Sequence, residues 1–261
     1  MNFATLVRSS RLLRPAVLAA GATVATGATL SSSAGAPKHT LVYFHVRALG
    51  ECPRMIMEYG GIPYEDCGPG PFFGVAGWMD AKPKTPFGQL PLLYVDGEEK
   101  PIAQMGAIAR YLASLVPSLV PDDPMEKARC DMIFEASREF DTLNPCVNVW
   151  RDAKFEAKKA EAFEFVPTKV ANLAKELGDK PFFCGDAVRF CDFAVYHVLS
   201  QVRLLEPAVF NAHPNLTRFM SNVEALPRVK EYLSGRPTPV GIGVKPVLEP
   251  NTPGLPARLR K

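Results

Sequence analysis

The sequence predicts two domains of different class, an N-terminal α/β domain and an all-helical C-terminal domain. Between residues 38 and 116, short apolar runs typical of strands alternate with two helical patterns. From 125 to 236, apolar residues recur at helical spacing almost throughout. The segment 117–124 contains three prolines and is predicted to be a linker. A chain of 261 residues is long enough for one or two domains.

The first 37 residues have the composition of an organellar transit segment. They are rich in Ala, Ser and Thr, include Arg8, Arg11 and Arg14, and contain no acidic residue. A mitochondrial address is the simplest interpretation; a plastid address, a secretory signal and a membrane anchor are the alternatives. Arg14 and Pro15 interrupt the apolar run, which disfavours a spanning helix.

The α/β domain is predicted to open with a strand and a helix. Residues His39–Val46 alternate between two largely apolar faces, as expected of a strand that is buried on both sides. Gly50 ends the turn that follows. Cys52 and Pro53 are placed as the N-cap and first residue of a helix that runs to Gly60.

The rest of this domain is predicted from turn signals and short apolar runs. Asp96-Gly97 is a strong hairpin signal, and the freed N–H groups of a helix starting at Gln104 favour a carboxylate. The order βαβ followed by ββα is the thioredoxin-like arrangement. The predicted elements are a strand at Tyr64–Cys67, an irregular connection with one short helix at most at 69–78, strands at Leu90–Val95 and Lys100–Ile102, and the helix from Gln104.

The C-terminal domain is predicted to be a bundle around one buried helix. Phe190–Leu204 is nearly all apolar, and a helix without a polar face is normally central. The segment 237–261 is rich in proline and glycine, so we predict a tail without regular structure. The other predicted helices are 125–152, 154–177 with an interruption at Pro167, Asn215–Ala225 and Pro227–Leu233.

Charge and cysteine content narrow the class of partner. The net charge of +3 is too small to indicate a nucleic-acid partner. The six cysteines form no CxxC pair and show no spacing typical of a metal site. We therefore expect reduced intracellular thiols, no metal and no nucleic acid.

One stretch resembles a known family. Pro86-Phe87-Gly88-Gln89-Leu90-Pro91, the Asp-Gly hairpin, Gln104 and the Ala-Ile-Ala-Arg-Tyr-Leu-Ala helix are similar to the glutathione-binding half of cytosolic glutathione transferases. The form of this run is most similar to the sigma class, with alpha, mu and pi as neighbours. The resemblance extends from Lys38 to about Arg236 and implies that the peptide bond before Pro91 is cis.

The resemblance implies an enzyme that conjugates or isomerises a small electrophile with glutathione as co-substrate. Tyr43 matches the family's catalytic tyrosine at the end of the first strand. A neutral hydroxyl aimed at sulfur stabilises the thiolate, because it donates a hydrogen bond to the charged form. Such a reaction needs no metal. The expected partners are glutathione, a small hydrophobic electrophile and a second copy in a homodimer.

The resemblance also implies where the substrates bind. Trp78 and Lys82 would hold the glycine carboxylate of glutathione, since an indole N–H and a cation suit an anion. Glu135 would reach the γ-glutamyl ammonium bound in the partner subunit. The implied glutathione residues are Trp78, Lys82, Gln89, Leu90, Pro91, Gln104, Met105 and Glu135, and those implied for the second-substrate pocket are Phe44, Phe134 and Arg138.

Three positions depart from the family pattern. Met105 replaces a serine that binds the γ-glutamyl carboxylate, Leu49 replaces an arginine that assists the tyrosine, and Arg189 replaces a Ser or Thr helix cap. The first two keep a second hypothesis open, a non-catalytic structural or accessory subunit of an organellar complex. A third hypothesis is thiol–disulfide exchange at Cys52, whose position at a helix start would favour the thiolate.

Overall fold

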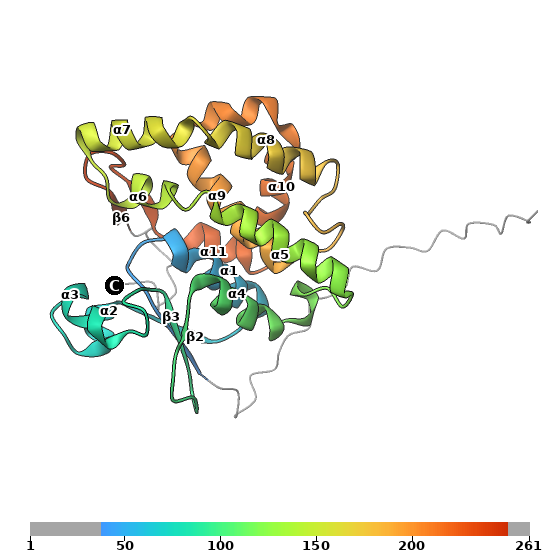
Figure 1. The fold of residues 1–261 in the computed structure, drawn as a ribbon. Helices are drawn as coiled ribbons and strands as arrows, with labels where there is room; N and C mark the ends of the chain where they lie inside the picture. Colours follow the sequence, from blue (N-terminus) through green and yellow to red (C-terminus); the bar gives the residue numbers. More distant parts are fainter. Residues whose placement is uncertain (1–37, 250–261) are drawn as a thin grey trace, which may run out of the picture.

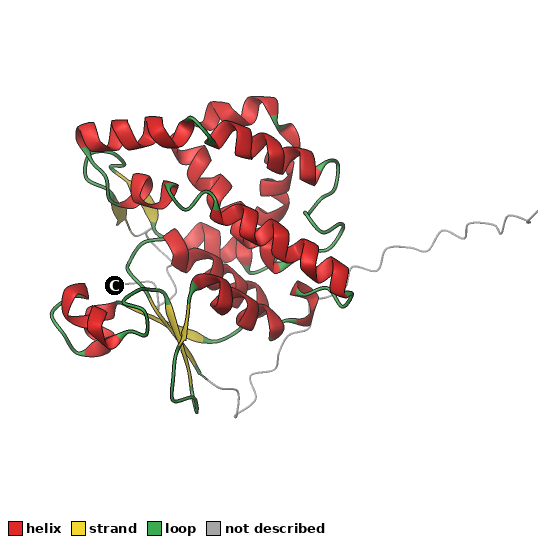
Figure 2. Cartoon of the chain, viewed as in Figure 1, coloured by secondary structure: helices red, strands yellow, loops and turns green. Residues whose placement is uncertain are grey.

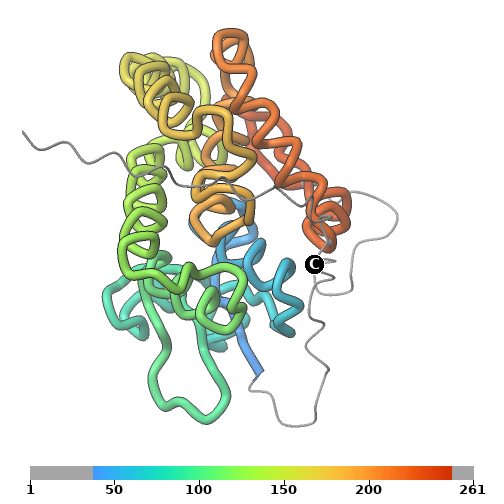
Figure 3. The backbone as a smooth tube through the Cα atoms, turned by 90° about the vertical axis from the view of Figure 1, so that its right-hand side faces the viewer, coloured from blue at the N-terminus to red at the C-terminus, as the bar shows by residue number. Residues whose placement is uncertain are grey.

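The computed structural model describes residues 38–249, and the predicted transit segment lies outside this range. A sheet with its helices forms one layer, and a bundle of helices forms the other (Figures 1 and 2). In the view turned by 90°, α11 (Val229–Gly235) lies beside α1 (Glu51–Gly60), so the end of the bundle packs on the α/β domain (Figure 3). Within the described range, no helix is both long and apolar enough to cross a bilayer.

The sheet has the predicted thioredoxin-like order. Its four strands are arranged β2-β1-β3-β4, with β1 parallel to β2 and antiparallel to β3. The first strand is shorter than predicted, because the chain makes one more backbone hydrogen bond, from Tyr43 N–H to the Cys67 carbonyl, and then leaves the sheet. The strands are β1 (His39–Val42), β2 (Tyr64–Cys67), β3 (Leu92–Val95) and β4 (Ile102–Ala103).

The first helix begins two residues earlier than predicted. A short 3-10 turn, Ala48–Gly50, runs directly into α1, so Gly50 is the N-cap and Cys52 lies inside the first turn. Pro53 is tolerated at the third position because the N–H groups of the first turn have no partner in the helix. The connection at 69–78 holds one short helix, as predicted, and a second helix begins at its last residue, Trp78. The remaining helices of this domain are α2 (Pro69–Phe73), α3 (Trp78–Ala81) and α4 (Met105–Ser114).

The C-terminal domain is helical, as predicted, but the long helix predicted at 125–152 is two helices. The first of them ends at Arg138, and Pro145 is the third residue of the second, where its missing N–H is tolerated. Inside one continuous helix, the Pro145 ring would crowd the Asp141 carbonyl. The predicted interruption near Pro167 is present: the next helix ends at Phe163, and Pro167 is the second residue of the helix that follows. The helices are α5 (Pro124–Arg138), α6 (Leu143–Asn148), α7 (Asp152–Phe163), α8 (Val166–Leu177), α9 (Phe190–Leu205), α10 (Pro214–Glu224) and α11.

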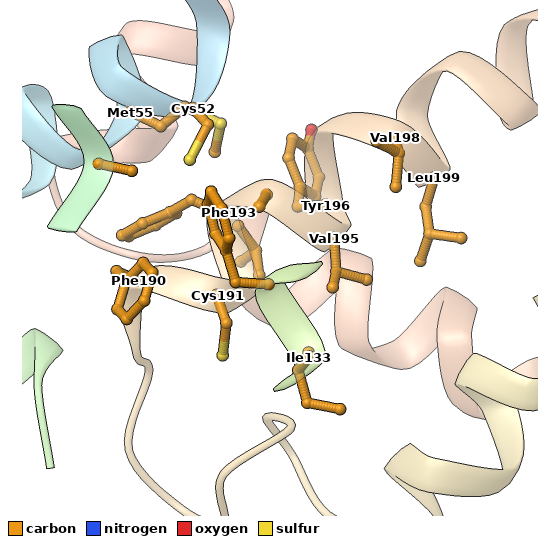
Figure 4. Packing of buried hydrophobic residues seen from close by; sticks show 14 of the residues in the cluster. Cys52, Met55, Ile133, Phe190, Cys191, Phe193, Val195, Tyr196, Val198 and Leu199 are labelled. Atoms are coloured by element: carbon orange, nitrogen blue, oxygen red, sulfur yellow. The ribbon is translucent and has the colours of Figure 1, made fainter. Parts of the chain in front are cut away.

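Helix α9 is the buried centre of the core, as its apolar sequence predicts. It packs against α5 in its own domain and α1 in the other (Figure 4). Phe193 and Tyr196 are almost inaccessible to solvent, and burying one such side chain stabilises the fold by about 1.5–3 kcal/mol. Asp192 accepts the Arg189 N–H at 2.7 Å and the Phe183 N–H at 2.9 Å, so it ties the N-cap residue and the preceding loop to the first turn of the helix.

A network of buried charges links the two domains where they meet. The Glu51 carboxylate binds the Arg236 guanidinium, and Arg54 lies 3.6 Å from Glu51 and 2.6 Å from Asp66. Burial alone would raise the pKa of Glu51, but the charges of Arg236, Arg54 and Arg47 outweigh it and lower the pKa to about 2. The network therefore joins β2 and α1 to the residue that follows α11.

The tail predicted without structure contains a small hairpin. Strand β5 (Thr238–Val240) pairs antiparallel with β6 (Val247–Glu249), and the Asp152 N–H donates to the Gly243 carbonyl at 2.7 Å. Gly243 has a φ of +80°, and a Cβ there would lie 2.6 Å from the Phe155 ring, so only glycine fits. Residues 250–261 lie outside the described range.

Candidate functional site

A cavity of about 330 Å³ lies where the turn before β3 meets α4 and α5. The Leu90–Pro91 peptide bond is cis, which confirms the expectation from the resemblance. Seven of the residues predicted to bind the two substrates line this cavity, and α5 contributes one of them. The lining is Leu49, Trp78, Gly88, Gln89, Leu90, Pro91, Gln104, Met105 and Arg138.

The start of α4 presents backbone donors to the cavity. Gln104, its N-cap, has φ 71° and ψ 120°, a conformation that costs a non-glycine residue about 1–3 kcal/mol. The Gln104 amide donates to the Gln89 side-chain oxygen at 2.9 Å, so the two glutamines predicted for glutathione are in contact. No described side chain caps this helix, and its first-turn N–H groups suit a carboxylate.

Tyr43 lies beside the cavity with its hydroxyl oriented by the backbone. The Leu49 N–H donates to the Tyr43 oxygen at 3.2 Å, and Leu49 itself lines the cavity. A hydroxyl that accepts this bond keeps its own proton for donation to another group. Burial raises the pKa of Tyr43, partly offset by the bond from Leu49 and the charge of Arg54, so the phenol is neutral at pH 7.

The part of the site predicted to hold the glycine carboxylate of glutathione is only partly assembled. Trp78 lines the cavity and stacks edge-on against Phe44, with ring centroids 5.5 Å apart. Lys82 does not line it, but its side chain passes next to Gly88, which does. The aromatic pair and the lysine therefore lie on the same side of the cavity as the turn before β3.

Two residues predicted for the substrates lie elsewhere. Phe134 is fully buried against Phe190, with ring centroids 5.4 Å apart, so its predicted place in the second-substrate pocket is wrong. Phe134 lies one turn before Arg138 on the same face of α5, but at this position along the helix that face packs against the core. Glu135 makes an ion pair of 2.6 Å with Arg110 of the same chain, and its contact with a partner subunit stays a prediction.

Cys52 does not have the environment of a reactive thiol. Its side chain is 1% exposed, and it packs near Phe193 of α9 (Figure 4). Burial raises the pKa of this thiol, and the nearby Glu51 charge raises it further. The structure therefore contradicts the hypothesis of thiol–disulfide exchange at Cys52.

Sequence reasoning overlooked two groups that shape the site. Asp141 accepts from Arg138 Nε at 2.8 Å and orients that guanidinium at the cavity. The spacing of three residues between an arginine and an acid could have indicated this pair. The Leu49 N–H could not be predicted, because a backbone donor has no signal in the residue type.

The chain is similar to known proteins over both domains. The models of the glutathione S-transferase N-terminal and C-terminal domains match residues 39–114 and 140–236. Glutathione S-transferase Mu 2 of Mus musculus is 36% identical over 200 residues, which are 74% of this chain and 89% of that protein. Glutathione S-transferase 1 of Ascaris suum is 33% identical over 209 residues, 77% of this chain and 98% of that protein.

A solved structure of the same family is also similar to this chain. The crystal structure of the glutathione S-transferase from Ascaris lumbricoides has a TM-score of 0.66 and 32% identity, and covers 77% of this chain and 98% of its own. Assignment to the sigma class is not confirmed and stays a prediction, since the sequence relatives include several Mu-class proteins. This chain belongs to the glutathione S-transferase family, whose enzymes use glutathione as a co-substrate.

Proposed function

We propose that this protein conjugates glutathione to a small hydrophobic electrophile, with Tyr43 donating a hydrogen bond to the glutathione thiolate. The observation that supports this most directly is the Leu49 N–H bond to the Tyr43 oxygen, which leaves the hydroxyl proton free. A neutral donor stabilises a thiolate but not a thiol, so it lowers the thiol pKa. Isomerisation of the electrophile would use the same thiolate, which is released again after the rearrangement.

The cavity offers a place for each part of glutathione. The uncapped start of α4, with Gln104 and Met105, would receive the γ-glutamyl carboxylate. The backbone next to Pro91 would pair with the cysteinyl unit, and Trp78 and Lys82 would face the glycine carboxylate. With glutathione bound in this direction, its cysteinyl sulfur would lie toward Leu49 and Tyr43.

The electrophile would bind between Phe44 and Arg138. Phe44 offers an aromatic face beside Tyr43, with ring centroids 5.5 Å apart. Arg138 adds a cation that Asp141 holds in place. An apolar electrophile with an electron-withdrawing group fits such a pocket, because the cation would stabilise negative charge that develops during attack.

Replacing the hydroxyl of Tyr43 tests the proposal. We expect Tyr43→Phe to lower kcat with a chloronitroaromatic substrate by roughly 100-fold, the effect of losing one preorganised donor. The pKa of bound glutathione, followed by thiolate absorbance, should rise in parallel. Calorimetric glutathione binding by parent and variant should remain similar, and equal kcat values in the two proteins would overturn the role of Tyr43.

A second function is favoured by one observation at the cavity. Met105 lines it and has no hydroxyl to bind the γ-glutamyl carboxylate. A structural or accessory subunit of an organellar complex would keep the fold without tight glutathione binding. Calorimetry separates the two functions: absence of glutathione binding by the parent, restored by Met105→Ser, would favour the accessory role.

We also propose a homodimer and a mitochondrial address. Phe87, Met125 and Met132 are large apolar side chains exposed by 67%, 61% and 51%, and a second copy could cover such side chains. Light scattering of the parent and of Phe87→Ser tests the dimer. The transit composition of residues 1–37 supports import, and imaging a fluorescent fusion with and without this segment tests the address.

A further inference from the structure

Three cysteines that are separated in sequence converge in the helical domain. Cys130 comes from the first half of α5, Cys184 from the loop before α9, and Cys191 from the first turn of α9. Their sulfur atoms all lie within 4.8 Å of one another, and the Cys184 and Cys191 sulfurs are 3.8 Å apart. None of the three lines the glutathione cavity, so the proposed function does not use this cluster.

The spacing of the sulfurs suits one central ion. Three sulfurs in a plane that each lie about 2.3 Å from an ion are about 4 Å from one another. The cluster approaches this spacing without movement of the backbone. Cys130 and Cys191 are completely buried, whereas Cys184 is partly exposed and provides a route from solvent.

The ligand set discriminates between metals. A structural zinc site and an iron–sulfur cluster each need four protein ligands, whereas within residues 38–249 this group contains three thiols and no further His, Asp or Glu ligand. Thiolates prefer soft ions, of which Cu(I) accepts trigonal coordination by three sulfurs. The three thiol ligands therefore favour a soft monovalent ion over a hard ion or an ion that needs tetrahedral coordination.

Two cations and one acid lie around the cluster. Lys180 and Arg189 interact favourably with a negative charge on Cys184, whereas burial and Asp192 disfavour one on Cys191. Arg189 is fixed in place because its guanidinium donates to the Ser118 carbonyl at 2.7 Å. The Asp192 carboxylate opposes this effect, but it is occupied by the N–H groups of Arg189 and Phe183.

We propose that Cys130, Cys184 and Cys191 form a three-thiolate binding site for a soft metal ion, with Cu(I) as the ion that fits. Binding forms three metal–sulfur bonds and releases up to three S–H protons to solvent. No electron is transferred, because the ion enters and remains as Cu(I). The site would give the helical domain a metal-binding capacity that is separate from the glutathione cavity.

An anaerobic competition titration tests the proposal. Reduced full-length protein is titrated with Cu(I) against a chromogenic Cu(I) chelator, and the sulfur ligands are counted by X-ray absorption. We expect one ion per chain with three sulfur neighbours, and a loss of affinity of more than about tenfold in Cys184→Ser, since even outer-shell changes cost that much. Cys184 is the variant of choice because it is the least buried of the three.

Cys146→Ser is the matched control, because Cys146 is a buried cysteine outside the cluster. It should bind Cu(I) like the parent, and circular dichroism should show that both variants are folded. Equal Cu(I) affinities in the parent and in Cys184→Ser would overturn the proposal. A tight complex with two sulfur neighbours would overturn it as well, and so would a parent that takes up Zn²⁺ in preference to Cu(I).

Discussion

The cavity beside Pro91 and the domain boundary are neighbouring polar sites built from different groups. At the cavity, Leu49 and the start of α4 contribute backbone N–H groups. Two residues after Leu49, Glu51 contributes a carboxylate that is 1% exposed and faces Arg236 and Arg54. Backbone donors survive a change of side chain, whereas a buried charge does not. The cavity should therefore tolerate substitution, and the boundary should not.

Removing the charge of Glu51 is the most severe test of this difference. Glu51→Gln leaves Arg236, Arg54 and Arg47 facing one another without their shared anion. Because breaking a buried ion pair strands the remaining charge, we expect the free energy of unfolding to fall by about 3–5 kcal/mol. Urea unfolding followed by circular dichroism measures this change.

The matched control is a carboxylate of the same domain at the surface. Glu65 pairs with Lys38 at 2.7 Å, but the two side chains are 56% and 52% exposed. Exposed ion pairs contribute little because water screens them, so Glu65→Gln should leave the unfolding curve unchanged. If the two variants were equally stable, the boundary network would not depend on its side-chain charges.

Acid should weaken the boundary through the buried His197, which interacts with Glu51 and Arg236. Burial lowers the pKa of His197 to about 4, with Glu51 opposing and Arg236 adding to the shift. Between the unfolded pKa near 6.5 and this value, the unfolded chain binds more protons, so stability falls as the pH falls through that window. His197 alone should contribute a loss on the order of 3 kcal/mol between pH 7 and pH 4. Asp192, whose pKa burial raises to about 7, changes stability in the opposite sense over the same window. Urea unfolding at several pH values measures it.

A histidine replacement isolates this contribution. The difference in stability between the parent and His197→Asn should carry most of this change above pH 4.5. Asp192 and Glu51, with pKa values of about 7 and about 2, are present in both proteins and cancel in that difference. His213→Gln changes a partly exposed histidine and should keep the dependence of the parent. An unchanged pH profile in His197→Asn would assign the acid sensitivity to other groups.

At the cavity, a new side-chain donor should strengthen glutathione binding by adding to the backbone N–H donors at the start of α4. Met105→Ser introduces a hydroxyl at the start of α4, and we expect glutathione affinity to rise by about ten- to hundredfold. Met105 is 6% exposed, so the variant also loses buried apolar surface and stability. Met105→Ala loses the same surface without gaining a hydroxyl, and calorimetry should show no gain in affinity. Equal affinities in the two variants would mean that the γ-glutamyl carboxylate binds elsewhere.

The parts of the fold predicted from sequence are those determined by local pattern. Tyr64–Cys67 was predicted as a short run between turn signals, and the helix from Phe190 from its nearly all-apolar sequence, and the structure confirms both. The break between Arg138 and Leu143 was readable from Pro145, which cannot stand inside one continuous helix. The hairpin after Thr238 was not, because its position depends on Gly243 meeting the Phe155 ring.

The site residues also divide into those that a local motif predicts and those whose position depends on packing. The residues around Pro91 were predicted because they form one contiguous motif. Phe134 was misplaced because helical spacing gives the face of a residue but not where along the helix the cavity ends. The convergence of Cys130 with Cys191 depends on the packing of α5 against α9, which no spacing in the sequence reveals.

The smallest expected effect is at Leu49, where the contact with Tyr43 is made by the main chain. Leu49→Ala keeps the N–H that donates to the Tyr43 oxygen, so kcat should fall by less than about threefold, under about 0.7 kcal/mol. Steady-state kinetics beside Tyr43→Phe gives the comparison. A loss in Leu49→Ala as large as in Tyr43→Phe would mean that the leucine side chain, and not its N–H, orients the tyrosine. The cavity would then depend on side chains as the domain boundary does.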